Sequence, residues 1–162
     1  MIHSYFDSPI GKLLLTSDGQ SLTALYTAEH GRLPVDPGPR ADTEFTVIKE
    51  QLGQYFAGER TRFDLPLTLG GTEFQRRVWQ LLQTIEFGDT RSYGQLAAEL
   101  GNPNASRAVG SANGRNLISI IVPCHRVVAG SGKLAGYAGG LTAKQWLLQH
   151  ERAIADRHAV PA

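Results

Sequence analysis

The hydrophobic pattern of this chain changes its period at the pair Gly70-Gly71. Before that pair, short apolar runs separated by turn residues are typical of β-strands. After it, apolar residues recur at the spacing that is typical of amphipathic helices. The sequence therefore predicts an α/β domain over residues 1–69, a mainly helical domain over residues 72–155, and a C-terminal tail over residues 156–162.

The N-terminal part is expected to hold a β-hairpin, a helix and a further strand. Residues 12–27 form two strand-like runs around Asp18-Gly19, which is a strong hairpin signal. Apolar residues at helical spacing over 45–56 predict a helix. Residues 63–69 alternate between apolar and polar side chains, which predicts one more strand.

The C-terminal part carries helix-start signals near both of its ends. Thr72 and Gln75 match a capping box, in which each side chain accepts a hydrogen bond from the backbone N–H of the other residue. This pair predicts a helix that runs to about residue 85. Thr142 and Gln145 predict a second capping box, at the start of a final helix.

Two short helices are expected between these signals. One covers residues 93–100 and would be capped by Ser92; the other covers residues 105–114 and would be capped by Asn104. A tight turn of Gly, Asn and Pro at 101–103 joins them. Two short helices around such a turn are the outline of a helix-turn-helix, a motif that binds DNA.

The number of cysteines and the length of the apolar runs exclude some classes of protein. The chain has one cysteine, so we expect neither an internal disulfide nor a cysteine-based zinc site, and we predict no metal. Its apolar runs are too short to cross a bilayer, and its first residues lack the features of a signal peptide. These features favour a reducing compartment, and we expect the cytoplasm and no membrane partner.

Charge is divided unevenly along the chain. Residues 1–70 carry six Lys and Arg against nine Asp and Glu, whereas residues 71–162 carry ten against six. A basic C-terminal half suits a partner that carries phosphates.

The apolar stretch over residues 120–128, expected to begin as a strand, contains Cys124 and His125. A thiol with an ordinary pKa near 8.5 is only a few per cent ionised at neutral pH, so a nucleophilic cysteine needs a base. Neighbouring side chains of an extended segment point in opposite directions, so His125 can serve Cys124 only in a tight turn and through a water molecule. Taken alone, the pair is also compatible with a cysteine that is simply buried.

The surrounding motifs reduce this ambiguity. They are FQRRVW at 74–79, RSYGQLA at 91–97, SRAVG at 106–110, NGRN at 113–116, PCHRV at 123–127 and GYAGG at 136–140. Together they closely resemble the O6-alkylguanine-DNA alkyltransferase family over residues 72–152, about half of the chain.

The resemblance implies a fold and a reaction. The fold would be a ribonuclease-H-like N-terminal domain and a helical domain with a helix-turn-helix. The reaction would be the repair of duplex DNA bearing O6-alkylguanine, by irreversible transfer of the alkyl (methyl) group to Cys124, once per molecule and without a cofactor. The protein would be a monomer in solution, and cooperative binding on DNA stays open.

The resemblance also implies roles for residues around the thiol. Cys124 would accept the alkyl group, and His125 would be the water-mediated base. Glu151 would orient that base. Asn116 would tie the preceding helix to the active-site turn.

Further residues would recognise the base. Tyr93 would donate to a ring nitrogen of guanine, and Lys144 would lie near the leaving base. Tyr137 would form a wall of the alkyl pocket, and the N–H of Ala138 would reach the guanine oxygen. The carbonyl of Val127, with that of the cysteine, would accept from the exocyclic amine.

DNA binding is implied by the second short helix. Arg107 would be the finger that fills the space left by a flipped nucleotide. The small residues Ala105, Ser106 and Gly110 would let this helix approach the floor of the minor groove.

Leu117 and Ser119 depart from the common pattern of the family, which has proline or another apolar residue at these places. Ser119 is therefore expected to change the pocket wall. Two alternatives stay open. One is a protein that only binds the lesion, although relatives of that kind have tryptophan in place of Cys124. The other is a cysteine hydrolase that turns over.

Overall fold

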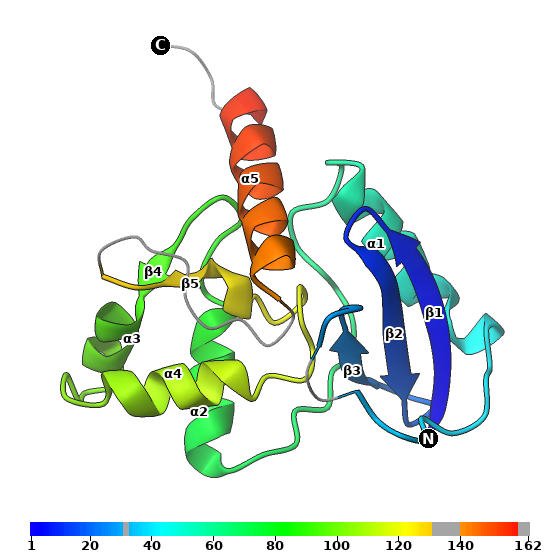
Figure 1. Cartoon of the computed structure of the whole chain (residues 1–162), viewed down its shortest axis with the longest axis horizontal. Helices are drawn as coiled ribbons and strands as arrows, with labels where there is room; N and C mark the ends of the chain where they lie inside the picture. The colour runs from blue at the N-terminus through cyan, green and yellow to red at the C-terminus, as the bar shows by residue number, and fades with distance from the viewer. Residues whose placement is uncertain (31–32, 131–139, 159–162) are drawn as a thin grey trace.

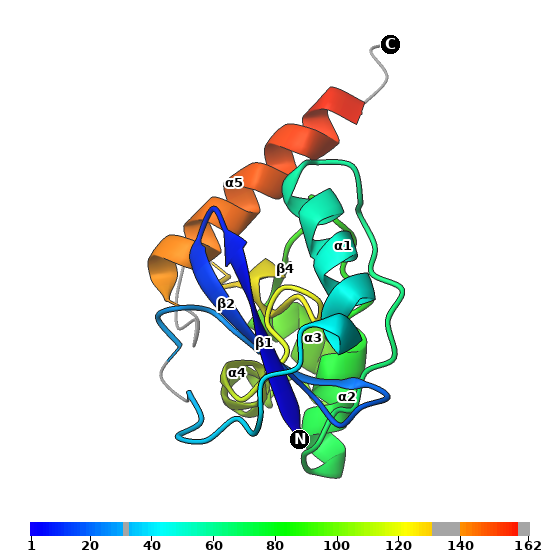
Figure 2. The ribbon, with the colours of Figure 1, turned by 90° about the vertical axis from the view of Figure 1, so that its right-hand side faces the viewer.

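The computed structural model describes residues 1–30, 33–130 and 140–158 of the chain. Figure 1 shows two lobes, a sheet with one helix and a group of short helices, with the long C-terminal helix α5 (Leu141–His158) between them. Seen from the side, α5 runs obliquely across the molecule near the end of α1 (Thr46–Phe56; Figure 2). The candidate site lies among the elements that α5 contacts.

The N-terminal lobe is built on an antiparallel three-stranded sheet. Its strands, in spatial order, are β1 (Ile2–Ser8), β2 (Gly11–Ser17) and β3 (Leu22–Tyr26). The predicted hairpin between β2 and β3 is confirmed. Side chains alternate along β2, so that Leu13 and Leu15 enter the main core while Leu14 joins a smaller cluster on the other face.

Helix α1 (Thr46–Phe56), which follows the short 3₁₀ helix η1 (Thr43–Phe45), confirms the helix expected over 45–56. Its buried residues Leu52 and Tyr55 belong to the main core. Gly58 lies just beyond the helix with φ of +80°, a conformation that L side chains rarely adopt. A Cβ at this glycine would lie 2.7 Å from Cδ1 of Ile154 in α5, so α1 ends in close contact with the C-terminal helix.

The strand expected over residues 63–69 is wrong. This segment runs beside β3, but within the described residues the two make only an isolated parallel bridge between Leu22 and Leu67. Pro66 accepts a hydrogen bond from Leu22 but has no N–H to donate. Further along β3 the next isolated bridge joins Leu25 to Ile118, so a different segment takes the place of residues 63–69 there.

Short helices fill the second lobe. They are α2 (Glu73–Leu82), α3 (Tyr93–Glu99) and α4 (Ser106–Gly114). Thr72 and Gln75 form the predicted capping box. Ser92 caps α3 as expected, in a second capping box with Gln95. The cap expected at Asn104 is wrong, because α4 begins one residue later and has no side-chain cap.

Helices α3 and α4 pack against each other across the turn that joins them, and both bury apolar residues in the main core, Leu96 from α3 and Val109 from α4. The indole of Trp79 in α2 donates to the carbonyl of Ala112 in α4 at 2.8 Å. Two short strands, β4 (Arg91–Ser92) and β5 (Val127–Val128), pair in parallel and join the start of α3 to the segment after Cys124.

The start and the end of α5 differ from expectation. The helix begins at Leu141, and the N–H of Lys144 donates to the carbonyl of Gly140, so Thr142 lies inside the first turn and does not form the expected cap. Residues 156–158 continue the helix where a tail was expected. No helix in the described parts of the chain is both long and apolar enough to cross a membrane.

Candidate active site

The apolar segment before Cys124 forms a compact buried turn, so the strand expected there is wrong. It touches β3 through one bridge, Leu25 to Ile118, and Ile120 has a positive φ of 72°, which breaks an extended path. The N–H of Val122 donates back to the carbonyl of Ile118 at 3.0 Å. The turn satisfies its backbone groups locally, which explains why an apolar run can be buried here without a sheet.

Asn116 holds this turn from inside. Its Oδ1 accepts from the N–H of Ile118 at 3.0 Å, and its Nδ2 donates to the carbonyl of Val122 at 2.8 Å. The same Nδ2 lies 3.1 Å from Sγ of Cys124. One buried side chain therefore links the end of α4, the turn and the thiol.

Cys124 and His125 lie in the 3₁₀ helix η2 (Cys124–Arg126), so the tight turn required by the sequence is present. Both side chains are buried. His125 Nε2 lies 2.8 Å from Oε2 of Glu151 in α5. Because a carboxylate only accepts, the neutral imidazole carries its proton on Nε2. Its Nδ1 is then an unprotonated acceptor, and it has no hydrogen-bond partner among the described residues.

Burial lowers the pKa of His125, and the attraction of Glu151 only partly offsets this. The imidazole is therefore neutral at pH 7. Burial by itself would raise the pKa of Glu151, but His125 and Arg126 reverse this and hold the pKa well below its usual range. Because a neutral imidazole supplies no charge, Arg126 is the cation that keeps Glu151 ionised at this pH.

Arg126 belongs to the site although no role was predicted for it from the sequence. Its Nε donates to Oε1 of Glu151 at 2.7 Å and its Nη2 to Oε2 at 2.9 Å, while its Nη1 donates to the carbonyl of Ile85 at 2.7 Å. Such a two-point contact fixes the plane of the carboxylate. In the sequence, the only signal for this role is the position of Arg126 in the PCHRV motif.

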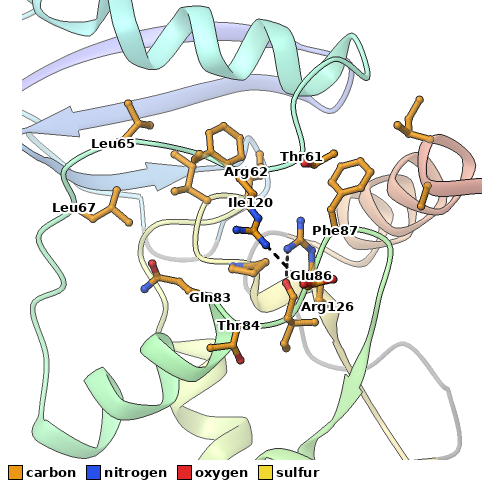
Figure 3. A pocket seen from close by; sticks show the side chains of 16 residues that line it. Thr61, Arg62, Leu65, Leu67, Gln83, Thr84, Glu86, Phe87, Ile120 and Arg126 are labelled. Carbon is orange, nitrogen blue, oxygen red and sulfur yellow. Dashed lines mark hydrogen bonds and ion pairs between the residues drawn. The ribbon is translucent and has the colours of Figure 1, made fainter. Parts of the chain in front are cut away.

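Arg126 also lines a pocket of about 680 Å³. Figure 3 shows its walls, the loop over residues 61–67 and the segment over residues 83–87. Cys124 is not among the lining residues. This pocket is therefore not where a group attacked by the thiol would lie.

Tyr55 is a second residue that sequence reasoning missed. Its hydroxyl donates to Oε2 of Glu151 at 2.6 Å, across 96 positions of sequence. The side chain comes from α1 and is fully buried. Nothing in the local sequence distinguishes it from a core aromatic residue.

Of the residues expected to recognise the base, Lys144 and Val127 contact each other. Lys144 is buried, and its Nζ donates to the carbonyl of Val127 at 2.6 Å. Asn113 donates from Nδ2 to the carbonyl of Cys124 at 3.3 Å. Each carbonyl keeps a second lone pair, so neither contact prevents a further donor from binding.

Tyr93 lies at the start of α3, half-buried. Burial raises the pKa of Tyr93, and the nearby Cys124 raises it further, so the hydroxyl stays protonated and can donate at neutral pH. Burial lowers the pKa of Lys144, and Cys124 opposes this shift. Both groups therefore sense the charge on the sulfur.

The residues expected to bind DNA lie on one element. Arg107 is exposed on α4, with Ser106 beside it and Ala105 just before the helix. A Cβ at Gly110 would contact the Tyr93 ring at 3.7 Å, so α4 also lies next to the expected base site. The exposed Arg107 and the buried Cys124 therefore lie on elements that are connected in the chain.

Ser119 is buried, and its N–H donates to the carbonyl of Leu25 in β3 at 3.1 Å. The turn is thus attached to the N-terminal lobe at this residue. Tyr137 and Ala138 lie outside the described residues. Among the described residues, no three His, Cys, Asp or Glu side chains come together as a metal site.

The arrangement contains the three groups that an activated nucleophile requires: a thiol, an imidazole and a carboxylate that contacts the imidazole. Cys124 and His125 share one turn, and Glu151 holds the imidazole with its unprotonated nitrogen available. This is the general organisation of an activated nucleophile.

Comparisons with known proteins cover nearly the whole chain. The family model of the 6-O-methylguanine DNA methyltransferase ribonuclease-like domain matches residues 1–69, and that of the DNA binding domain of the same enzymes matches residues 73–153. A methylated-DNA–protein-cysteine methyltransferase of Mycolicibacterium paratuberculosis is 56% identical over 150 residues, which is 90% of this chain and 89% of that protein. One from Methanosarcina acetivorans is 47% identical over 153 residues, or 93% of this chain and 98% of that protein.

Solved structures agree with these matches. The crystal structure of Mycobacterium tuberculosis OGT in complex with DNA superposes with a TM-score of 0.86 at 49% identity, over 95% of this chain and 94% of that chain. The O6-methylguanine-DNA methyltransferase of Pyrococcus kodakaraensis gives a TM-score of 0.62 at 28% identity, over 93% and 98%.

Proposed function

Because the chain belongs to the 6-O-methylguanine DNA methyltransferase family, we propose that it repairs O6-alkylguanine in duplex DNA by transferring the alkyl group to Cys124. The family resemblance of its motifs and its predicted class, a methylated-DNA–protein-cysteine methyltransferase, are confirmed by the same matches. The observation that carries the proposed site is the position of Cys124 between Asn116 and the His125–Glu151 pair.

The first step is removal of the thiol proton. His125 Nδ1 takes it through a water molecule, and the imidazolium that forms is stabilised by Glu151, 2.8 Å from Nε2. Asn116 donates to the sulfur, which favours the thiolate over the thiol. Glu151 itself stays ionised throughout, because Arg126 contacts both of its oxygens.

In the second step the thiolate attacks the alkyl carbon. A sulfur–carbon bond forms, the bond between that carbon and O6 breaks, and the electron pair goes to the guanine. Tyr93, whose raised pKa keeps its hydroxyl protonated, donates to a ring nitrogen and stabilises this charge. Lys144 adds a positive group close to the sulfur and the leaving base.

Guanine is selected by groups around the same turn. The carbonyls of Cys124 and Val127 accept from the exocyclic amine, which adenine does not present at this place. Tyr137 forms a wall of the alkyl pocket, and the N–H of Ala138 donates to the guanine oxygen. Ser119 modifies the pocket wall.

The product is a thioether, a very poor leaving group, and the chain has no second cysteine to displace it. Each molecule therefore acts once. This distinguishes the proposal from a cysteine hydrolase, which releases product and turns over, and from a protein that only binds the lesion.

DNA enters along α4. Helices α3 and α4 act as the helix-turn-helix, and the small residues Ala105, Ser106 and Gly110 let α4 lie against the minor groove. The lesion reaches Cys124 by nucleotide flipping, and Arg107 fills the space left in the stack. The exposure of Arg107 on the helix that leads to Asn116 supports this path.

We further propose that residues 1–69 and 72–155 act as two domains of a monomer, with cooperative binding on DNA left to experiment. A reactive thiol stays reduced only in a reducing compartment, which supports the cytoplasm as its location. No step of the proposed reaction uses a cofactor.

The test is mass spectrometry of the intact protein after incubation with duplex DNA that contains O6-methylguanine. The expected result is the gain of one methyl mass, located on the peptide that contains Cys124, and none with Cys124→Ser. Methyl release continuing beyond one equivalent of protein would overturn the proposal, and so would binding of the lesion without any gain of mass.

A further inference from the structure

Oε2 of Glu151 is shared by donors from both lobes. It accepts from His125 Nε2 at 2.8 Å, from Arg126 Nη2 at 2.9 Å and from the Tyr55 hydroxyl at 2.6 Å. His125 and Arg126 belong to the turn of the nucleophile, whereas Tyr55 belongs to α1 of the N-terminal lobe. The oxygen that orients the base is therefore also bound by the other lobe.

Tyr55 is held firmly enough to position that oxygen. Its ring is fully buried, with ring centroids 5.4 Å from Phe63 and 6.0 Å from Phe87. Its backbone carbonyl lies 2.9 Å from Nε2 of His150, the residue before Glu151 in α5. One residue of α1 thus contacts two consecutive residues of α5, one through its backbone and one through its hydroxyl.

We infer that Tyr55 is a positioning residue, through which the N-terminal lobe holds Glu151, and with it His125, in place for proton transfer from Cys124. This inference rests on the proposed function. It assigns to the N-terminal lobe a part in the chemistry, acting through Glu151, since Tyr55 does not reach the reacting atoms.

Loss of the hydroxyl has a definite electrostatic consequence. A donor on Oε2 withdraws charge from the oxygen that faces the imidazole. Without it, the carboxylate attracts a protonated His125 more strongly and is less well fixed, because among the described residues Arg126 and His125 remain as its contacts. The titratable and charged groups that face His125 are Glu151 and Lys144 from α5, Cys124 and Arg126 from its own turn, and, through Glu151, Tyr55 from α1.

The test is Tyr55→Phe, which keeps the ring and removes the hydroxyl. Single-turnover methyl transfer at neutral pH is expected to fall about tenfold, the effect of one lost charge-assisted hydrogen bond. The acidic limb of the rate against pH is expected to move to higher pH. In an NMR titration, the midpoint of the His125 resonances is expected to move to higher pH as well.

Two variants separate positioning from packing. Tyr26→Phe removes the hydroxyl of another buried tyrosine in the same lobe and should leave rate and pH profile unchanged. His150→Phe removes the contact with the Tyr55 carbonyl but keeps an aromatic ring; it should lower the melting temperature without moving the acidic limb.

A double-mutant cycle with Glu151→Gln completes the test: adding Tyr55→Phe to that variant should change the rate no further. The inference is overturned if Tyr55→Phe keeps the wild-type rate and pH profile, or if its effect persists in the Glu151→Gln background. The NMR titration of His125 needs only the folded protein, without a DNA substrate, so it does not depend on methyl transfer. A wild type without methyl transfer would refute the proposed function, and an unchanged His125 titration would still refute the inference separately.

Discussion

The side-chain amide of Asn116 donates to the sulfur of Cys124 across 3.1 Å. Its other contacts, with Ile118 and Val122, fix the turn that carries the thiol. The contact is therefore both structural and electrostatic, because the same Nδ2 donates to the sulfur and to the carbonyl of Val122.

Asn116→Asp keeps the size of the side chain but replaces the donating amide by an acceptor, so it removes the hydrogen bonds to both the sulfur and the Val122 carbonyl. The melting temperature of the variant reports the structural part of this loss, and the rate of methyl transfer is read on folded protein. We expect single-turnover methyl transfer to slow by about tenfold or more, since a carboxylate beside the sulfur disfavours the thiolate. Gln20→Glu, the same exchange on the exposed hairpin turn, is the matched control. An unchanged rate in folded Asn116→Asp protein would show that this contact does not influence the sulfur.

Acid should destabilise the protein in two successive windows. His125 has a pKa below its ordinary 6.5, so as the pH falls through 6.5 the unfolded chain takes up its proton before the folded one, and stability declines. Glu151 has a pKa below its ordinary 4.5, so its contribution is present above 4.5 and is lost as the pH falls below it towards the folded value.

Calorimetric melting temperatures between pH 8 and about pH 3 measure this dependence, because the lower window begins only at 4.5. The melting temperature should begin to fall near pH 6.5 and fall further below 4.5. Glu151→Gln should be less stable at pH 7 and should lack the lower window. A melting temperature that does not change across this range would contradict the assignment of a neutral histidine and an ionised carboxylate.

Arg107→Ala should slow repair of duplex DNA much more than reaction with a free O6-alkylguanine base. Nucleotide flipping costs a few kcal/mol, and only the duplex reaction requires it. We expect at least a tenfold difference between the two effects, measured as single-turnover rates. Arg115→Ala removes the same charge just after α4 and should weaken duplex binding without this difference. Equal losses in both reactions would make Arg107 a structural residue.

Ser119→Pro tests whether the pocket wall limits the reaction with bulky free bases. The structure also indicates a loss of stability in this variant that the sequence did not reveal. Proline fills the wall and should speed reaction with free O6-benzylguanine several-fold while methyl repair changes little. It also deletes the N–H that donates to Leu25. Loss of that bond should cost about 1–2 kcal/mol and lower the melting temperature by several degrees.

Ser119→Ala is the control, because it keeps the N–H and does not fill the wall. It should leave both the melting temperature and the benzyl rate near wild type. If Ser119→Pro leaves the benzyl rate unchanged, the wall is not what limits bulky free bases.

The local hydrogen-bonding signals were sufficient to predict several helix starts. The capping box of Thr72 and Gln75 and the cap at Ser92 formed as expected, because their partners lie only three residues apart. The same logic placed a cap at Asn104 and another at Thr142, and both are wrong. Residues that can cap a helix occur at many positions, and the packing of the helix decides which of them becomes the cap.

The sequence by itself determined the family, and it predicts Cys124 as the nucleophile, since both depend on residue types at fixed short spacings around Cys124. Tertiary structure alone decided that the apolar segment before it is a turn, with its backbone bound by Asn116 and β3. It alone brought Tyr55 onto the oxygen of Glu151, 96 positions away. The reason is that a contact between distant segments depends on which surfaces pack together, and burial in that packing sets the charge states of His125 and Glu151.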